Sequence, residues 1–188
     1  MNDYDSQHDV AVGATALRGA DVAPGRVLRT HYKVEAYDAR GRLKWADEFC
    51  NLVVNAGLDD SLDKHFKASG YTAAWYVGLT DGTPSFAAGD TMASHAGWSE
   101  VTAYDEAARQ TLTLGAVSGQ SVDNSGSKAT FTVSSDGTTI GGAFLCTSST
   151  KGGTSGTLYG GGAFSAGDKS LDDGDTLQVT VTLTASAS

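Results

Sequence analysis

The segment of residues 175–184 constrains the fold more than any other part of the chain. It reads Asp-Thr-Leu-Gln-Val-Thr-Val-Thr-Leu-Thr, so leucine and valine alternate with threonine and glutamine. Successive side chains of an extended strand point to opposite faces, and this alternation therefore predicts one buried face and one solvated face. We expect a β-strand that packs against a core.

Other parts of the chain carry similar strand patterns between turn-like clusters of Gly, Ser and Asp. The predicted strands cover residues 27–37, 43–54, 73–79, 111–117, 129–133, 140–146 and 158–164. One segment differs, because Leu58, Leu62 and Phe66 recur at the spacing of a short amphipathic helix over residues 58–66. About eight short strands and one helix favour an all-β, mainly antiparallel fold, a β-sandwich or jelly roll.

The domain organisation follows from where this periodicity begins. Residues 26–188 form the predicted β-sandwich domain, which is long enough to bury a core without disulfides or metals. Residues 1–25 show no period and end in Pro24-Gly25, so we expect a flexible N-terminal arm that orders only on assembly. No leader-like segment and no apolar run of about 20 residues is seen, so we expect a protein that is made in a cytoplasm and stays soluble.

Charge is unevenly distributed along the chain. The formal net charge is -9, which disfavours nucleic acid and anionic membrane as partners. Residues 18–44, however, hold seven Lys or Arg against three Asp or Glu. Five of these basic residues are candidates for an interface with an acidic partner, and the alternative is that they form the solvated face of a hairpin: Arg26, Arg29, Lys33, Arg40 and Arg42.

Motifs for catalysis or for cofactor binding are not found. The chain has no nucleophile elbow, P-loop or dinucleotide fingerprint. The four histidines, His8, His31, His65 and His95, are scattered over unlike elements and predict no metal site. Cys50 and Cys146 are expected to be buried free thiols, with a single disulfide as the alternative. We therefore expect no enzyme activity, no cofactor and no metal.

Three further features can be interpreted as purely structural or as functional. The acidic residues Asp172, Asp173 and Asp175 suit a hairpin turn with solvated carboxylates better than a calcium site. Glycines near residues 141, 152 and 160 favour close packing over ligand access. The aperiodic stretch 85–106 predicts a long loop, on which His95, Trp98 and Tyr104 are candidates for an exposed platform that stacks on sugars.

Several segments resemble small virion proteins of tailed bacteriophages, in particular capsid decoration (cement) proteins. The similar segments are residues 41–45, 51–58, 71–81, 88–100 and 174–181, so the resemblance spans about residues 27–184. It implies a non-enzymatic β domain, commonly a homotrimer, that clamps neighbouring major capsid subunits from outside. No catalytic residues carry over from such proteins.

The leading hypothesis is therefore a structural protein on the capsid surface of a virion, with the major capsid protein as its partner and a homo-oligomeric state, trimer favoured. A tail or tail-fibre β domain is the first alternative, because β-sandwiches build those parts as well. A carbohydrate-binding module that acts through Trp98 and Tyr104 is the second.

Overall fold

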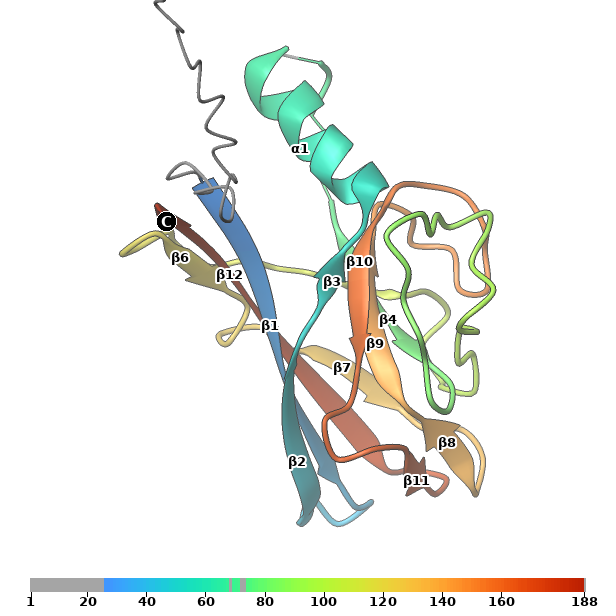
Figure 1. Ribbon diagram of the computed structural model, residues 1–188. Helices are drawn as coiled ribbons and strands as arrows, with labels where there is room; N and C mark the ends of the chain where they lie inside the picture. Colours follow the sequence, from blue (N-terminus) through green and yellow to red (C-terminus); the bar gives the residue numbers. More distant parts are fainter. Residues whose placement is uncertain (1–25, 68, 72–73, 188) are drawn as a thin grey trace, which may run out of the picture.

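A computed structural model describes residues 26–67, 69–71 and 74–187, and the predicted arm, residues 1–25, lies outside this part of the chain. The prediction of an all-β sandwich is confirmed: two five-stranded antiparallel sheets pack together, and one helix stands at an end of them (Figure 1). The elements of the first half are β1 (Arg26–Tyr37), β2 (Leu43–Cys50), β3 (Leu52–Val53), α1 (Asn55–Phe66), β4 (Tyr76–Thr80) and β5 (Gln110–Thr111). Those of the second half are β6 (Ser121–Asp123), β7 (Ala129–Thr132), β8 (Thr138–Ile140), β9 (Gly142–Cys146), β10 (Leu158–Ala163), β11 (Lys169–Leu171) and β12 (Thr176–Ala187).

The first sheet is built on the two longest strands. Strands β1 and β12 pair along their full length, from Arg26 opposite Ala187 to Tyr37 opposite Thr176. Strand β2 extends this pair on one side, and β6 and β7 both pair with β12 on the other. The predicted β1–β2 hairpin is confirmed, with the Asp38 carboxylate accepting the amides of Arg40 and Arg42 across the turn. The two ends of the described chain therefore lie side by side.

The second sheet has the order β3-β10-β9-β4-β5, and β8 and β11 form a small separate ribbon. Strands β2 and β3 are almost continuous, so the chain crosses from one sheet to the other at Asn51, whose amide still bonds the Thr30 carbonyl of the first sheet. A β-bulge at Tyr159 shifts the register of β10 against β9. This bulge turns the Tyr159 carbonyl toward the start of α1, where it accepts the Val54 amide.

The main core lies between the sheets and uses the predicted alternation. Leu177, Val179 and Val181 of β12 are fully buried, beside Tyr32 of β1. The Tyr32 ring stacks on Phe49 with ring centroids 4.9 Å apart. Fully burying a side chain of this kind stabilises the fold by about 1.5–3 kcal/mol, so the strict alternation of β12 explains why this strand occupies the centre of its sheet.

A second apolar cluster covers the outer face of the second sheet. The long excursion between β4 and β5 folds back over this face and places Met92 and Trp98 against Phe144 of β9. Glycines make room for the rings: a Cβ on Gly78 would lie 2.2 Å from the Phe144 ring, and one on Gly161 would lie 2.2 Å from Phe86. The second sheet is thus buried on both faces, which is why β9 and β10 read as continuous apolar runs.

The helix is confirmed, but it packs differently from the expected amphipathic helix. Gly57 is the one buried residue of α1. It lies so close to β10 that a Cβ at this position would be 2.4 Å from the Tyr159 carbonyl oxygen. The apolar positions Leu58, Leu62 and Phe66 are instead exposed. The helix projects beyond the end of the sandwich rather than lying on a sheet (Figure 1).

Two parts of the predicted strand pattern are wrong. The expected strand over residues 111–117 is reduced to β5, because the Leu112 amide still bonds Trp75 but the chain then leaves the sheet. Strands β6, β8 and β11 were not expected as separate elements, since each has three residues and is too short to show a period.

Candidate functional site

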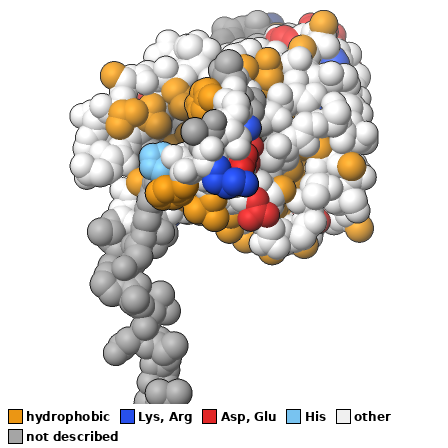
Figure 2. Space-filling view, turned by 90° about the horizontal axis from the view of Figure 1, so that it is seen from above, with side chains coloured by type: hydrophobic (Ala, Val, Ile, Leu, Met, Phe, Trp, Pro, Cys, Tyr) orange, Lys and Arg blue, Asp and Glu red, His pale blue; other side chains and the backbone are white. Residues whose placement is uncertain are grey.

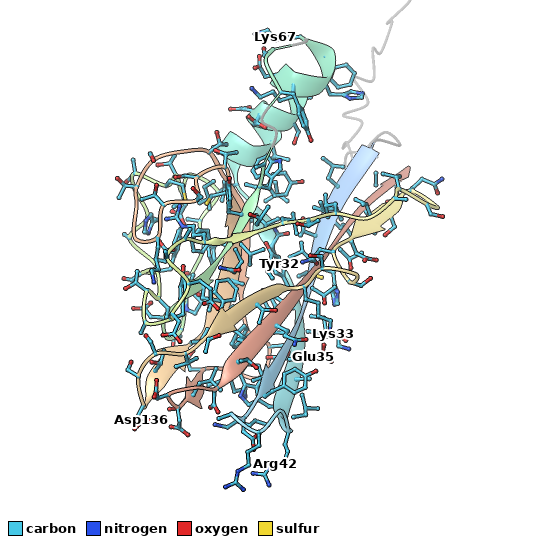
Figure 3. The ribbon with its side chains drawn as sticks, turned by 180° about the vertical axis from the view of Figure 1, so that it is seen from behind. Tyr32, Lys33, Glu35, Arg42, Lys67 and Asp136 are labelled. Carbon is cyan, nitrogen blue, oxygen red and sulfur yellow. The ribbon has the colours of Figure 1, made fainter. Side chains whose placement is uncertain are left out.

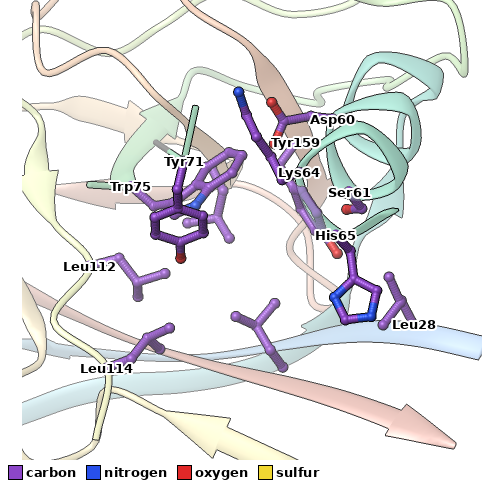
Figure 4. Close-up of a pocket in the computed structure, with 12 residues that line it drawn as sticks. Leu28, Asp60, Ser61, Lys64, His65, Tyr71, Trp75, Leu112, Leu114 and Tyr159 are labelled. Atoms are coloured by element: carbon purple, nitrogen blue, oxygen red, sulfur yellow. The ribbon is translucent and has the colours of Figure 1, made fainter. Parts of the chain in front are cut away.

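An apolar hollow of about 420 Å³ opens at the α1 end of the sandwich (Figure 4). It lies between the two sheets, with Leu28 of β1 and Leu183 of β12 on one side and Leu145 of β9 and Tyr159 of β10 on the other. Its walls are Leu28 and Leu183 of the first sheet, the apolar residues Trp75, Leu112, Leu114, Leu145 and Tyr159, and Tyr71, Asp60, Ser61, Lys64 and His65 around the mouth. At this end the described residues therefore leave the space between the two sheets partly unfilled.

A second hollow of about 260 Å³ adjoins the first and shares Leu28, Tyr159 and Leu183 with it. It continues across the first sheet to Gln120 and to Val117, whose side chain is 75% exposed. We call the two hollows together the end groove. Its walls are mainly leucines, valines and aromatic rings. The charged groups of α1 lie at one rim, and the polar residues Arg29, Gln120, Ser121 and Thr184 line the far end.

The exposed side of α1 is a second apolar surface at the same end. Leu58, Leu62 and Phe66 are 43%, 57% and 72% exposed, and they recur every four residues along one side of the helix. We call these three residues the α1 stripe. The side of α1 that lines the end groove is a different one and carries Asp60 and Lys64.

Most large apolar side chains that remain exposed gather at this end of the molecule. Of the eight in the described part of the chain, six belong to the α1 stripe or to the rim and walls of the end groove. Figure 2, which looks down on this end, shows hydrophobic side chains gathered there, with basic, acidic and His side chains beside them. Leu43 and Leu52 are the two elsewhere. A concentration of this kind is typical of a binding surface.

The five basic candidates do not form one patch. Arg26 is the first residue of β1 and Arg29 follows at the same end, whereas Arg40 and Arg42 lie in the β1–β2 turn at the opposite end of a strand roughly 35 Å long. Figure 3 shows Lys33 midway between Arg42 and the α1 end. Their role in binding stays a prediction, but Arg29 and Arg42 cannot contact the same small site.

Carboxylates neutralise part of this basic stretch. Arg42 Nε lies 2.7 Å from Asp38, and Lys33 Nζ lies 3.2 Å from Glu35. Glu35 also accepts a hydrogen bond from Lys128, which is the main reason that the pKa of its carboxyl lies below the usual value. The outer face of the first sheet is therefore a mixed-charge surface and not a basic one.

The predicted exposed platform is wrong for two of its three residues. Trp98 is 5% and Tyr104 2% exposed, because Trp98 packs against Phe144 in the second apolar cluster and Tyr104 packs against Phe131 in the main core. Trp98 Nε1 donates to Asp90, and its ring is covered by the half-buried His95 at a centroid distance of 3.7 Å. Lys151 lies over the Tyr104 ring at 4.2 Å. Trp98 and Tyr104 therefore offer no open aromatic face to a sugar.

The buried cation Arg109 was not predicted, because no local pattern around it indicates burial. Its side chain is inaccessible and forms a two-point pair with Glu100, with nitrogen–oxygen distances of 2.8 and 2.7 Å. The same guanidinium donates to the carbonyls of Ser148 and Gly153, 2.9 and 2.6 Å away. Arg109 thus fastens the β9–β10 loop to the excursion, and its role is structural.

The acidic turn after β11 is confirmed as a turn, but one carboxylate is not solvated. Asp175 is 4% exposed and pairs with Lys44 at 2.5 Å while it accepts the Asp172 amide. Asp172 and Asp173 are exposed, as expected. Across the described residues, no group of three or more His, Cys, Asp or Glu side chains is placed to hold a metal ion.

Both cysteines are free thiols, and only one is buried. Cys146 lies on β9 under the excursion, and burial raises the pKa of its thiol. Cys50 is exposed at the end of β2, which corrects the expectation that both are buried. It directly follows the buried Phe49 in an alternating strand, so its side chain lies on the outer face of the first sheet.

Within the part of the chain that the structure describes, no helix has the length and apolar character needed to cross a membrane. Comparison with known proteins found no matching family model, no matching curated protein and no matching solved structure.

Proposed function

We propose that this protein is a non-enzymatic structural protein of a tailed-phage virion, which decorates the capsid and stabilises it by binding major capsid subunits. The observation that carries the proposal is the α1 stripe, an apolar helix face held out from the sandwich. The resemblance of five segments to small virion proteins supplies the class of partner.

Exposing the apolar side chains of the α1 stripe to water is unfavourable, and burying them in an interface is favourable. Burying a leucine or phenylalanine side chain gains about 1.5–3 kcal/mol, and the three residues of the stripe keep roughly half of this surface in solvent. Tertiary packing does not require the exposure, because α1 is fixed through Gly57 on its other side. An amphipathic helix that lays its apolar face into a groove is a recurrent mode of protein recognition.

In the proposed assembly, this end of the molecule contacts the capsid. Arg29 lies at the same end and is exposed, so it sits at the rim of the proposed contact, while Arg40 and Arg42 face away. Rim charges act mainly on the association rate. The protein acts at the virion surface as a homo-oligomer, with a trimer favoured, and it uses no cofactor.

Binding to undecorated capsids tests the proposal with a matched pair of variants. Leu62 and Leu43 are 57% and 56% exposed but lie at opposite ends of the molecule. We expect Leu62→Asp to weaken binding at least about tenfold, a loss of roughly 1.4 kcal/mol, and Leu43→Asp to bind like the wild type. Equal affinity for both variants would exclude the α1 stripe as the contact.

The charge contribution has a matched pair as well. We expect Arg29→Glu to slow association in a salt-dependent manner and Arg40→Glu to leave the rate unchanged.

Antibody labelling of intact particles then distinguishes the capsid from the tail, since a tail-associated β domain would use the same apolar surface. A glycan screen addresses the carbohydrate-binding alternative, which the burial of Trp98 and Tyr104 leaves without its proposed platform.

A further inference from the structure

The end groove is an uncompleted end of the hydrophobic core. Leu28 and Leu183 point to the same side of the first sheet as the fully buried Tyr32 and Val181, but they are only half-buried, because a hollow separates them from Leu145 and Tyr159 of the second sheet. The groove they line is apolar and continuous over both hollows. A short apolar segment laid along the groove would complete the core with no change in either sheet.

The chain contains one segment of suitable chemistry next to this groove. Residues 10–17, Val-Ala-Val-Gly-Ala-Thr-Ala-Leu, form the longest uncharged run before β1, bounded by Asp9 and Arg18. Six of its eight residues are apolar, and most are small enough for a narrow groove. We propose that residues 10–17 occupy the end groove of their own chain.

The connection between the run and the groove permits this arrangement. Strand β1 starts at Arg26, two residues before Leu28, so the preceding chain enters the sheet beside the groove. Residues 18–25 can span up to roughly 26 Å when extended. Pro24-Gly25 immediately before β1 is a favourable turn dipeptide, which lets the chain reverse direction toward the groove instead of continuing away from the sheet.

The proposal differs from the expectation drawn from sequence, in which residues 1–25 order only on assembly, and it does not depend on the capsid. A site on the same chain keeps the local concentration of the run high and constant. It also leaves the α1 stripe uncovered, because the stripe lies on a different side of α1 from the groove.

Hydrogen exchange of the full-length chain tests the proposal. We expect the amides of residues 10–17 to exchange at least about tenfold more slowly than in an unstructured chain. Val12→Asp places a carboxylate in the apolar groove and is expected to abolish this protection. The matched control Val22→Asp makes the same change in the connecting segment and is expected to preserve it.

A variant of the groove checks the contact from the other side. Leu114 is 36% exposed at the groove wall, so Leu114→Asp leaves the fold intact, as circular dichroism will verify, while it releases residues 10–17. Wild-type exchange of residues 10–17 at the rate of an unstructured chain would overturn the proposal. If residues 10–17 lose their protection from exchange on hundredfold dilution, the segment in the groove comes from a second copy of the chain and the proposal is wrong. If Val12→Asp and Val22→Asp change the exchange equally, the groove is not the site.

Discussion

Replacing the buried cation by an apolar residue of similar length, Arg109→Met, should be among the most destabilising single changes in this protein. The substitution leaves the Glu100 carboxylate, which is 8% exposed, with the Gly152 amide as its remaining recorded partner. Removing one partner of a buried ion pair costs about 3–5 kcal/mol, since the other charge stays buried without compensation. The carbonyls of Ser148 and Gly153 lose their donors as well.

This cost converts into a measurable shift of the melting temperature. A domain of this size loses about 2–4 °C per kcal/mol, so Arg109→Met is expected to melt roughly 6–20 °C below the wild type. Urea unfolding at 25 °C gives the free energy directly. The matched control is Arg42→Met, because Arg42 also pairs with a carboxylate but is 73% exposed. An exposed pair contributes about 0–1 kcal/mol.

A double substitution identifies the cause of the loss. Adding Glu100→Leu to Arg109→Met removes the unpaired carboxylate, and we expect it to restore at least about half of the lost stability. The recovery stays incomplete because two loop carbonyls still lack donors. The reasoning fails if Arg109→Met costs less than about 1 kcal/mol, or if Arg42→Met costs as much as Arg109→Met.

Three further outcomes are expected. Gly78→Ala should lower the free energy of unfolding by about 1–3 kcal/mol, because its Cβ would meet the Phe144 ring at 2.2 Å, whereas Gly89→Ala, with nothing within 4 Å, should be neutral in urea melts. The lowered pKa of Glu35 implies that its contribution is present above the unfolded-state pKa and is lost as the pH falls through the folded-state pKa. Glu35→Gln should therefore flatten the acid limb of the stability curve, and an unchanged limb would argue against the pair with Lys128. Chelator with reductant should leave the melting temperature unchanged, and a drop of more than about 10 °C would show that a metal or a disulfide supports the fold.

The apolar end of the molecule connects the two proposals. The α1 stripe faces away from the sandwich and is assigned to a capsid partner, whereas the end groove lies on the inner side of α1 and is assigned to residues 10–17. The two sets of variants are separable, because Leu62→Asp changes the stripe only and Leu114→Asp changes the groove only.

The local sequence determined where the long strands and the helix lie, but not the three-residue strands β6, β8 and β11. The alternation of β12 and of β1 predicts their inner faces, and the spacing of Leu58, Leu62 and Phe66 predicts a helix that the structure contains. These features depend on side-chain period and turn chemistry, which neighbouring residues carry by themselves.

Tertiary structure alone decided which apolar surfaces are covered. Trp98 lies in a stretch without a period, yet it is buried because the excursion folds over the second sheet, while the periodic α1 stripe is exposed because Gly57 fixes the helix from its other side. Arg109 finds Glu100 and the β9–β10 loop only after these distant segments meet. Burial depends on contacts between residues far apart in the chain. The periodicity of the sequence predicts only which side chains share a face of a strand or helix.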